Sequence, residues 1–143
     1  MFKNIFKKEK KEEPNNKNLL VAALLIRAAK MDENYTSIEK EIIKKALIDL
    51  NEINADQVDE LVNLAEKKED ASNQLIEFTK EIKKYSMDYR LKIIEVIWKI
   101  VYSDGISDNY ETNLIRRICG LLYVSDKDCG TIKEKVKKFQ NSK

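Results

Sequence analysis

The residues that offer the most chemistry lie in the sequence YSDGISDNYE, Tyr102 to Glu111. Two aspartates and a glutamate supply oxygen ligands, and Gly105 precedes Glu111 by the spacing found between the turn glycine and the last calcium ligand of an EF-hand. In that register the first and third loop positions fall on Ile100 and Tyr102, which carry no carboxylate. The first half of a calcium loop is missing, so this segment is not an EF-hand.

Helix-start chemistry explains most of the same residues. Gly105 allows the positive φ of a turn, Asp108 can cap the following helix, and Glu111 can return a hydrogen bond to that cap. Helix capping does not explain Asp104. This residue would follow the C-terminal end of a helix, where the macrodipole already places partial negative charge. A divalent cation held by carboxylates and free carbonyls would offset that cost. Capping alone, a cation site and a negatively charged docking patch are therefore three open interpretations.

A second acidic turn lies 72 positions earlier, where Asp32 corresponds to Asp104 and Glu39 to Glu111. The apolar positions on both sides of the turns correspond under the same offset. The sequence therefore predicts the same order of elements in each half of the chain. This order is a mostly buried helix, a turn that begins with Asp, a helix with a capping box and one further helix. If the halves pack about a pseudo-two-fold axis, both turns lie at one end of the bundle and their carboxylates can converge on one cation.

Helices must position these turns, because apolar residues recur at helical spacing and no segment alternates with a period of two. Two of the predicted helices are apolar over most of their circumference, which favours a central place for both in the fold. We expect an all-α bundle of seven helices with an internal two-fold repeat. The first is expected from Asn18, and the next six follow candidate caps at Thr36, Asn54, Ser72, Ser86, Asp108 and Ser125.

The 143 residues suit one domain, which we place at residues 18–140 after a basic, flexible tail at 1–17. In that tail Phe2, Ile5 and Phe6 would share one face of a helix, which suits weak adsorption to an anionic membrane surface. The alternative is an unstructured solubilising tail. No apolar run reaches the ~20 residues needed to cross a bilayer, so any membrane contact would be peripheral.

Composition excludes several function classes. The body is acidic between basic ends and carries no nucleic-acid motif, so a nucleic-acid partner is not expected. The chain contains no His, no Gly-rich phosphate loop and no nucleophile elbow, which argues against an enzyme. Cys119 and Cys129 make no CxxC motif and, without His, a poor zinc pair. They indicate a reduced, cytoplasmic protein.

The two turns and their flanking helices resemble the TerB family, the tellurite-resistance domain that is also similar to the N-terminal domain of DjlA co-chaperones. The resemblance rests on AALLIRAAKMDENYTSIEKEII, Ala22 to Ile43, and on IWKIVYSDGISDNYETNLIRRIC, Ile97 to Cys119. It covers about residues 18 to 140. The first turn departs from the family pattern, since it has Glu33 at the position of the turn glycine.

The resemblance implies a seven-helix fold and a non-enzymatic role in stress response. It implies that clustered acidic residues bind a divalent cation (Ca, Mg or Mn) and dock protein partners, including membrane-associated ones at the inner face of the membrane. The candidate ligands carried over by motif are Asp32, Glu39, Asp104, Asp108 and Glu111. The alternative is a purely structural interaction domain without metal, in which the acidic turns serve as helix caps.

Overall fold

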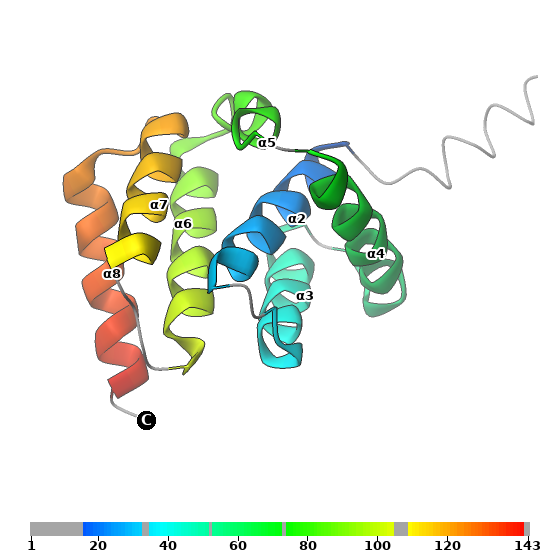
Figure 1. Ribbon diagram of the computed structural model, residues 1–143, viewed down its shortest axis with the longest axis horizontal. Coiled ribbons are helices and arrows are strands. Elements are labelled where there is room, and N and C mark those ends of the chain that lie inside the picture. The colour runs from blue at the N-terminus through cyan, green and yellow to red at the C-terminus, as the bar shows by residue number, and fades with distance from the viewer. Residues whose placement is uncertain (1–15, 33–34, 52, 73, 105–108, 142–143) are drawn as a thin grey trace, which may run out of the picture.

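A computed structural model describes residues 16–32, 35–51, 53–72, 74–104 and 109–141, with only the backbone at 16, 32, 104, 109–112 and 140–141. The described residues form seven α-helices and two short 3-10 helices, and they contain no strand (Figure 1). The predicted all-α, seven-helix fold is confirmed. The elements are α2 (Asn16–Ala29), η1 (Lys30–Asp32), α3 (Ser37–Asn51), α4 (Ala55–Ala71), α5 (Ile76–Ile82), α6 (Met87–Val101), η2 (Tyr102–Asp104), α7 (Asn109–Leu121) and α8 (Asp126–Asn141).

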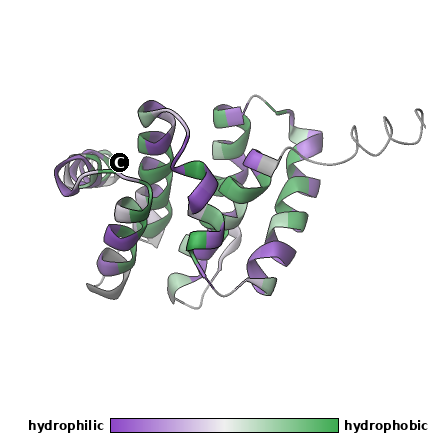
Figure 2. Ribbon diagram, turned by 90° about the horizontal axis from the view of Figure 1, so that it is seen from above, coloured by the Kyte–Doolittle hydropathy of each residue, from purple (hydrophilic) through white to green (hydrophobic). Residues whose placement is uncertain are grey.

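Helix α2 is central, as its apolar circumference predicts. The side chains from Val21 to Ile26 are fully buried, because α3, α4, α5 and α6 all pack against this helix. Figure 1 shows α2 among these neighbours, and in Figure 2 the hydrophobic residues lie mainly where the helices face one another. A helix without a polar face is stable in water only when other elements cover it on every side.

Helix α6 is the second central element. Its buried residues include Ile93, Ile97 and Trp98, and it packs against α2, α3, α7 and α8. It thus joins the N-terminal helices to the C-terminal pair. Trp98 lies in the core, as its apolar neighbours in the sequence predict.

Most predicted helix starts are confirmed by hydrogen bonds. Thr36 and Glu39 form a capping box before α3, Asn54 and Gln57 form one before α4, and Ser86 caps α6. At the start of α8, the Ser125 Oγ atom accepts a hydrogen bond from the amide of Asp128. Side-chain oxygens at these positions satisfy amides that have no partner inside the helix.

Ser72 is a correction to the sequence analysis. It caps the C-terminus of α4, and the next helix, α5, begins only at Ile76 without a side-chain cap. The Ser72 hydroxyl donates a hydrogen bond to Glu77, and its carbonyl accepts one from Arg27 at 2.5 Å. Ser72 therefore connects helices instead of starting one.

The boundaries of the helices recur at the offset of 72 positions that was found in the sequence. Lys30–Asp32 and Tyr102–Asp104 are both 3-10 helices, and each ends on an aspartate. In each half a largely buried helix precedes the 3-10 helix and another helix follows it. This correspondence concerns the local order of elements. The two-fold arrangement of the halves in space stays a prediction.

One buried ion-pair cluster ties α2 to α4. The Arg27 Nε atom donates to the Glu69 carboxylate at 2.7 Å, and Lys30 Nζ lies 2.7 Å from the other oxygen of the same carboxylate. Glu69 is only 6% exposed. A carboxylate in such a place is tolerated because both of its oxygens face cations.

Glu69→Ala is expected to lower the free energy of unfolding by about 3 kcal/mol, because it leaves the Arg27 charge part-buried without its carboxylate. Urea denaturation followed by circular dichroism measures the loss. The matched control is Asp70→Ala, which removes a largely exposed carboxylate that also pairs with Lys30 and should cost less than about 1 kcal/mol. Equal losses in the two variants would contradict the importance of burial.

Candidate functional site

The structure describes the predicted acidic turns only in part. Asp32 and Asp104 are the last residues of η1 and η2, and Glu111 lies in the first turn of α7, but their side chains are outside the described part of the chain. Asp108 lies outside it altogether, as do the predicted membrane-contacting residues Phe2, Ile5 and Phe6. Their roles as cation ligands and as a membrane-surface tail stay predictions.

Glu39 is the one predicted ligand whose side chain is described, and it acts as a cap. Its Oε1 atom accepts hydrogen bonds from the amide of Thr36 at 2.8 Å and from the Thr36 hydroxyl at 3.1 Å. The residue is only 6% exposed. These contacts are those of a capping box, so Glu39 takes part in starting α3.

The described residues contain no group of three His, Cys, Asp or Glu side chains that could hold a metal ion. A cation site built from both acidic turns would need the side chains of Asp32, Asp104 and Glu111, which are not among them. The cation site at the acidic turns therefore stays a prediction.

A polar cluster follows the first turn. The Tyr35 hydroxyl donates a hydrogen bond to Glu66 at 2.9 Å, and Lys40 Nζ lies 3.2 Å from the same Glu66 oxygen. Burial, assisted by Glu66, raises the pKa of Tyr35 above its usual value. Because Tyr35 belongs to the segment before α3 and Glu66 to α4, this cluster fixes where the chain leaves the turn.

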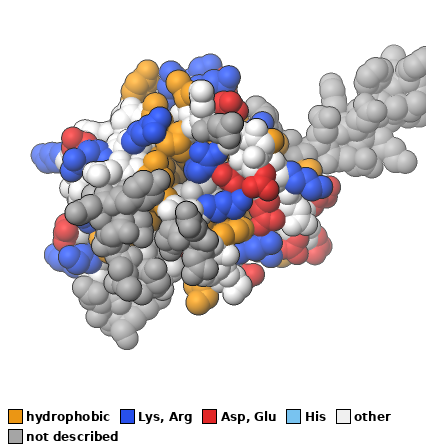
Figure 3. Space-filling model, in the orientation of Figure 1, with side chains coloured by type: hydrophobic (Ala, Val, Ile, Leu, Met, Phe, Trp, Pro, Cys, Tyr) orange, Lys and Arg blue, Asp and Glu red, His pale blue; other side chains and the backbone are white. Residues whose placement is uncertain are grey.

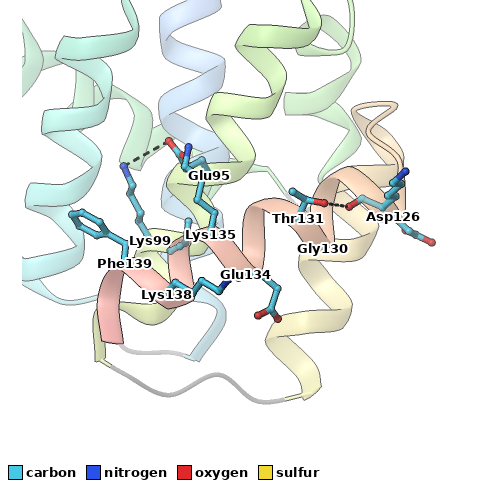
Figure 4. Close-up of a pocket in the computed structure, with 11 residues that line it drawn as sticks. Glu95, Lys99, Asp126, Gly130, Thr131, Glu134, Lys135, Lys138 and Phe139 are labelled. Atoms are coloured by element: carbon cyan, nitrogen blue, oxygen red, sulfur yellow. Dashed lines mark hydrogen bonds and ion pairs between the residues drawn. The ribbon is translucent and has the colours of Figure 1, made fainter. Parts of the chain in front are cut away.

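A groove formed by α3, α6 and α8 was not predicted from the sequence. Two hollows, of about 1210 and 580 Å³, lie along α8 and between α3 and α6, and both are lined by Glu95, Lys99 and Phe139. We refer to them together as the α3/α6/α8 groove. Figure 4 shows Lys99 and Phe139 on one side of it, with Lys135 and Lys138 further along α8. Helical periodicity places Phe139 on an apolar face, but the residue is 58% exposed.

The groove combines an apolar floor with a basic rim. Apolar side chains from three helices line it, and six lysines outnumber four acidic residues among its lining residues. Glu95 is paired with Lys135 at 2.8 Å and with Lys99 at 3.7 Å, and the Lys135 hydrogen bond lowers the pKa of its carboxyl group. Charged side chains are not confined to the groove, since basic and acidic side chains also lie among apolar ones on the face shown in Figure 3. The apolar residues of the groove are Ile42, Ala46, Leu50, Val96, Val136 and Phe139.

Tyr89, which lines the hollow between α3 and α6, makes stability depend on pH. Burial raises its pKa to about 12, and its hydroxyl donates a hydrogen bond to Asn51 at 2.7 Å. The unfolded chain has an ordinary tyrosine pKa near 10. The stability that neutral Tyr89 contributes is therefore complete below about pH 10 and is lost as the pH rises through about 12.

Tyr89→Phe should make the fall in unfolding free energy above about pH 10 shallower, since phenylalanine does not ionise. Urea unfolding at a series of pH values from about 8 to 12 measures the slope for both proteins. Tyr123→Phe is the matched control because Tyr123 is 65% exposed, and it should leave the slope unchanged. The interpretation fails if the Tyr89 variant keeps the original slope.

Comparison with known proteins identifies one family. The family model described as "Tellurite resistance protein TerB" matches residues 18–134, which is most of the chain. Searches of curated protein sequences and of solved structures gave no significant match. In addition, none of the helices in the described ranges is long and apolar enough to cross a membrane.

Proposed function

Because the chain belongs to the TerB family of tellurite resistance proteins, we propose that it is a non-enzymatic stress-response module that docks a partner protein in the α3/α6/α8 groove. The observation that carries this proposal is the exposed Phe139 beside two connected hollows with an apolar floor. An exposed aromatic next to an apolar groove is the usual arrangement of a docking surface, since such residues supply most of the binding energy.

The chemistry of the groove favours an acidic, amphipathic helix as the docked segment. Its apolar residues come from three neighbouring helices, so they can receive the apolar stripe of one further helix. The surplus of lysines on the rim then complements carboxylates on the exposed flank of that helix. Lys138 and Lys92 belong to this rim, and Glu95 is already paired with Lys99 and Lys135.

The chain's own N-terminal segment fits the groove less well. Residues 1–17 contain apolar side chains, but also six lysines against three glutamates. A basic segment would meet lysines of the same sign on the rim. A segment from an acidic partner protein is therefore the better occupant.

The docking proposal is tested by titrating the isotope-labelled full chain with a designed peptide of leucine and glutamate at helical spacing. We expect the amide signals of α3, α6 and α8 to shift. Phe139→Ala should weaken binding about tenfold, because it removes an apolar anchor worth ~1.4 kcal/mol. Ile76→Ala, which truncates an exposed apolar residue outside the groove, should bind as the unchanged protein does.

Two further peptides make the result specific. A peptide with lysine in place of every glutamate should not bind, and a peptide of residues 1–17 should compete poorly. Shifts that map to other helices would overturn the proposal. Tight binding of the 1–17 peptide in the groove would show that the groove holds the chain's own tail instead of a partner.

A second candidate is a divalent cation at the acidic turns. The observation in its favour is that both 3-10 helices end on an aspartate at the C-terminal side of a buried helix. Partial negative charge gathers at such helix ends, so a cation there would be stabilised by the helix as well as by carboxylates.

Calcium, magnesium or manganese at about 100 times its dissociation constant should then raise the melting temperature by about 5–10 °C, as mass action requires for a ligand of the folded state. Asp104→Asn combined with Glu111→Gln should abolish the rise. Glu60→Gln, an exposed substitution on α4, should preserve it. No shift at millimolar concentrations of any of the three ions would leave capping as the role of the turns.

A further inference from the structure

Two buried cysteines, Cys119 and Cys129, lie against each other in the core. Cys119 belongs to the last turn of α7 and Cys129 to the first turn of α8, and their Sγ atoms are 2.6 Å apart. No disulfide bond joins them in this structure. A disulfide bond is about 2.05 Å long, so bonding the two sulfurs needs only a small movement.

The corner between α7 and α8 holds this pair in place. The amide of Val124 donates to the carbonyl of Cys119 at 2.8 Å, and Tyr123 adopts a φ of 58°, which is the left-handed conformation of a helix C-cap. On the other side of the corner, the amide of Cys129 donates to the carbonyl of Ser125 at 3.0 Å. The backbone next to each thiol is therefore fixed, so their proximity does not depend on flexible side chains alone.

The two thiols differ in acidity. The hydrogen bond from Cys119, aided by Trp98 and Arg116, lowers the pKa of Cys129 to about 7, against the opposing effects of burial and Asp126. The same contact and deeper burial raise the pKa of Cys119. Of the two thiols, Cys129 therefore loses its proton more readily, and only the thiolate is an effective nucleophile.

The indole of Trp98 also favours a charged sulfur on Cys129. Its side chain is 2% exposed, and its indole N–H has no hydrogen-bond acceptor of good geometry among the described residues. It nevertheless lies close enough to Cys129 to lower the pKa of that thiol. A buried N–H donor without an acceptor is costly, and a thiolate on Cys129 would supply one.

Metal binding is a poorer explanation of the pair. The described residues provide no third His, Cys, Asp or Glu that could complete a metal site with the two sulfurs. A structural zinc site needs four protein ligands. Two adjacent thiols of unequal acidity are instead the arrangement of a nucleophilic cysteine with its resolving partner.

We propose that Cys119 and Cys129 are a modification site, a reversible intramolecular disulfide formed by reaction with a peroxide. The Cys129 thiolate attacks one peroxide oxygen, the O–O bond breaks, and the departing hydroxide takes a proton to become water. Cys129 is now a sulfenic acid. The Cys119 sulfur attacks it, the S–S bond forms, and a second water leaves with the Cys119 proton. Two thiols are oxidised and one hydrogen peroxide is reduced, and an external dithiol reverses the bond.

The test uses the full chain in native buffer at neutral pH, treated with hydrogen peroxide. We expect the thiol titre to fall from two per chain to none, and dithiothreitol to restore both. Peptide mapping without reduction should find Cys119 joined to Cys129 within one chain. Trp98 is the only tryptophan, so its fluorescence should decrease at the same rate as the thiol titre.

Single substitutions distinguish the nucleophilic cysteine, Cys129, from the resolving cysteine, Cys119. In Cys119→Ser the sulfenic acid on Cys129 has no partner thiol and should be trapped by dimedone, whereas Cys129→Ser should leave Cys119 unmodified. Cys119→Ala also removes the partner thiol and should give the same result as Cys119→Ser. Circular dichroism checks that each variant is folded. Persistence of both thiols in the unchanged protein, or a disulfide only between chains, would overturn the proposal.

Discussion

The whole fold depends on covering one helix that has no polar face. Helix α2 buries the run from Val21 to Ile26 completely, and four other helices pack around it. Leaving such a run in water would cost about 25 cal/mol for each square ångström of apolar surface. The positions of α3, α4, α5 and α6 are therefore coupled, because each supplies part of the same enclosure. The α3/α6/α8 groove is formed by two of these covering helices, α3 and α6, together with α8.

Covering α2 on all sides brings a charged residue of its last turn, Arg27, next to the core. Its guanidinium is held by Glu69 and by the carbonyl of Ser72, so a cation beside the core is neutralised and hydrogen-bonded. This satisfies the requirement that buried charge be paired, and it fixes the junction of α4 and α5 against α2. The contact explains why Ser72 ends a helix, although its residue type and place suggested that it begins one.

Sequence patterns predicted the fold more completely than the site. Local hydrogen bonding determines where a helix starts, so capping residues such as Asn54, Ser86 and Ser125 could be identified from residue type and spacing. The same reasoning identified Glu39 as a cap, which its contacts with Thr36 confirm, whereas its role as a candidate ligand came from the family resemblance and stays a prediction. The α3/α6/α8 groove was missed because it is formed by helices that are distant in sequence, and periodicity gives no information about what faces a helix.

The sequence by itself determined the helices, their order, the two central ones and the membership of the TerB family, because these follow from local pattern and motif. Only the tertiary structure decided that Phe139 stands exposed beside a groove, and that Cys119 meets Cys129 at the corner between α7 and α8. In the sequence these were one apolar residue and two unremarkable thiols. Their chemistry arises from neighbours brought together by folding, and no spacing along a single helix encodes those neighbours.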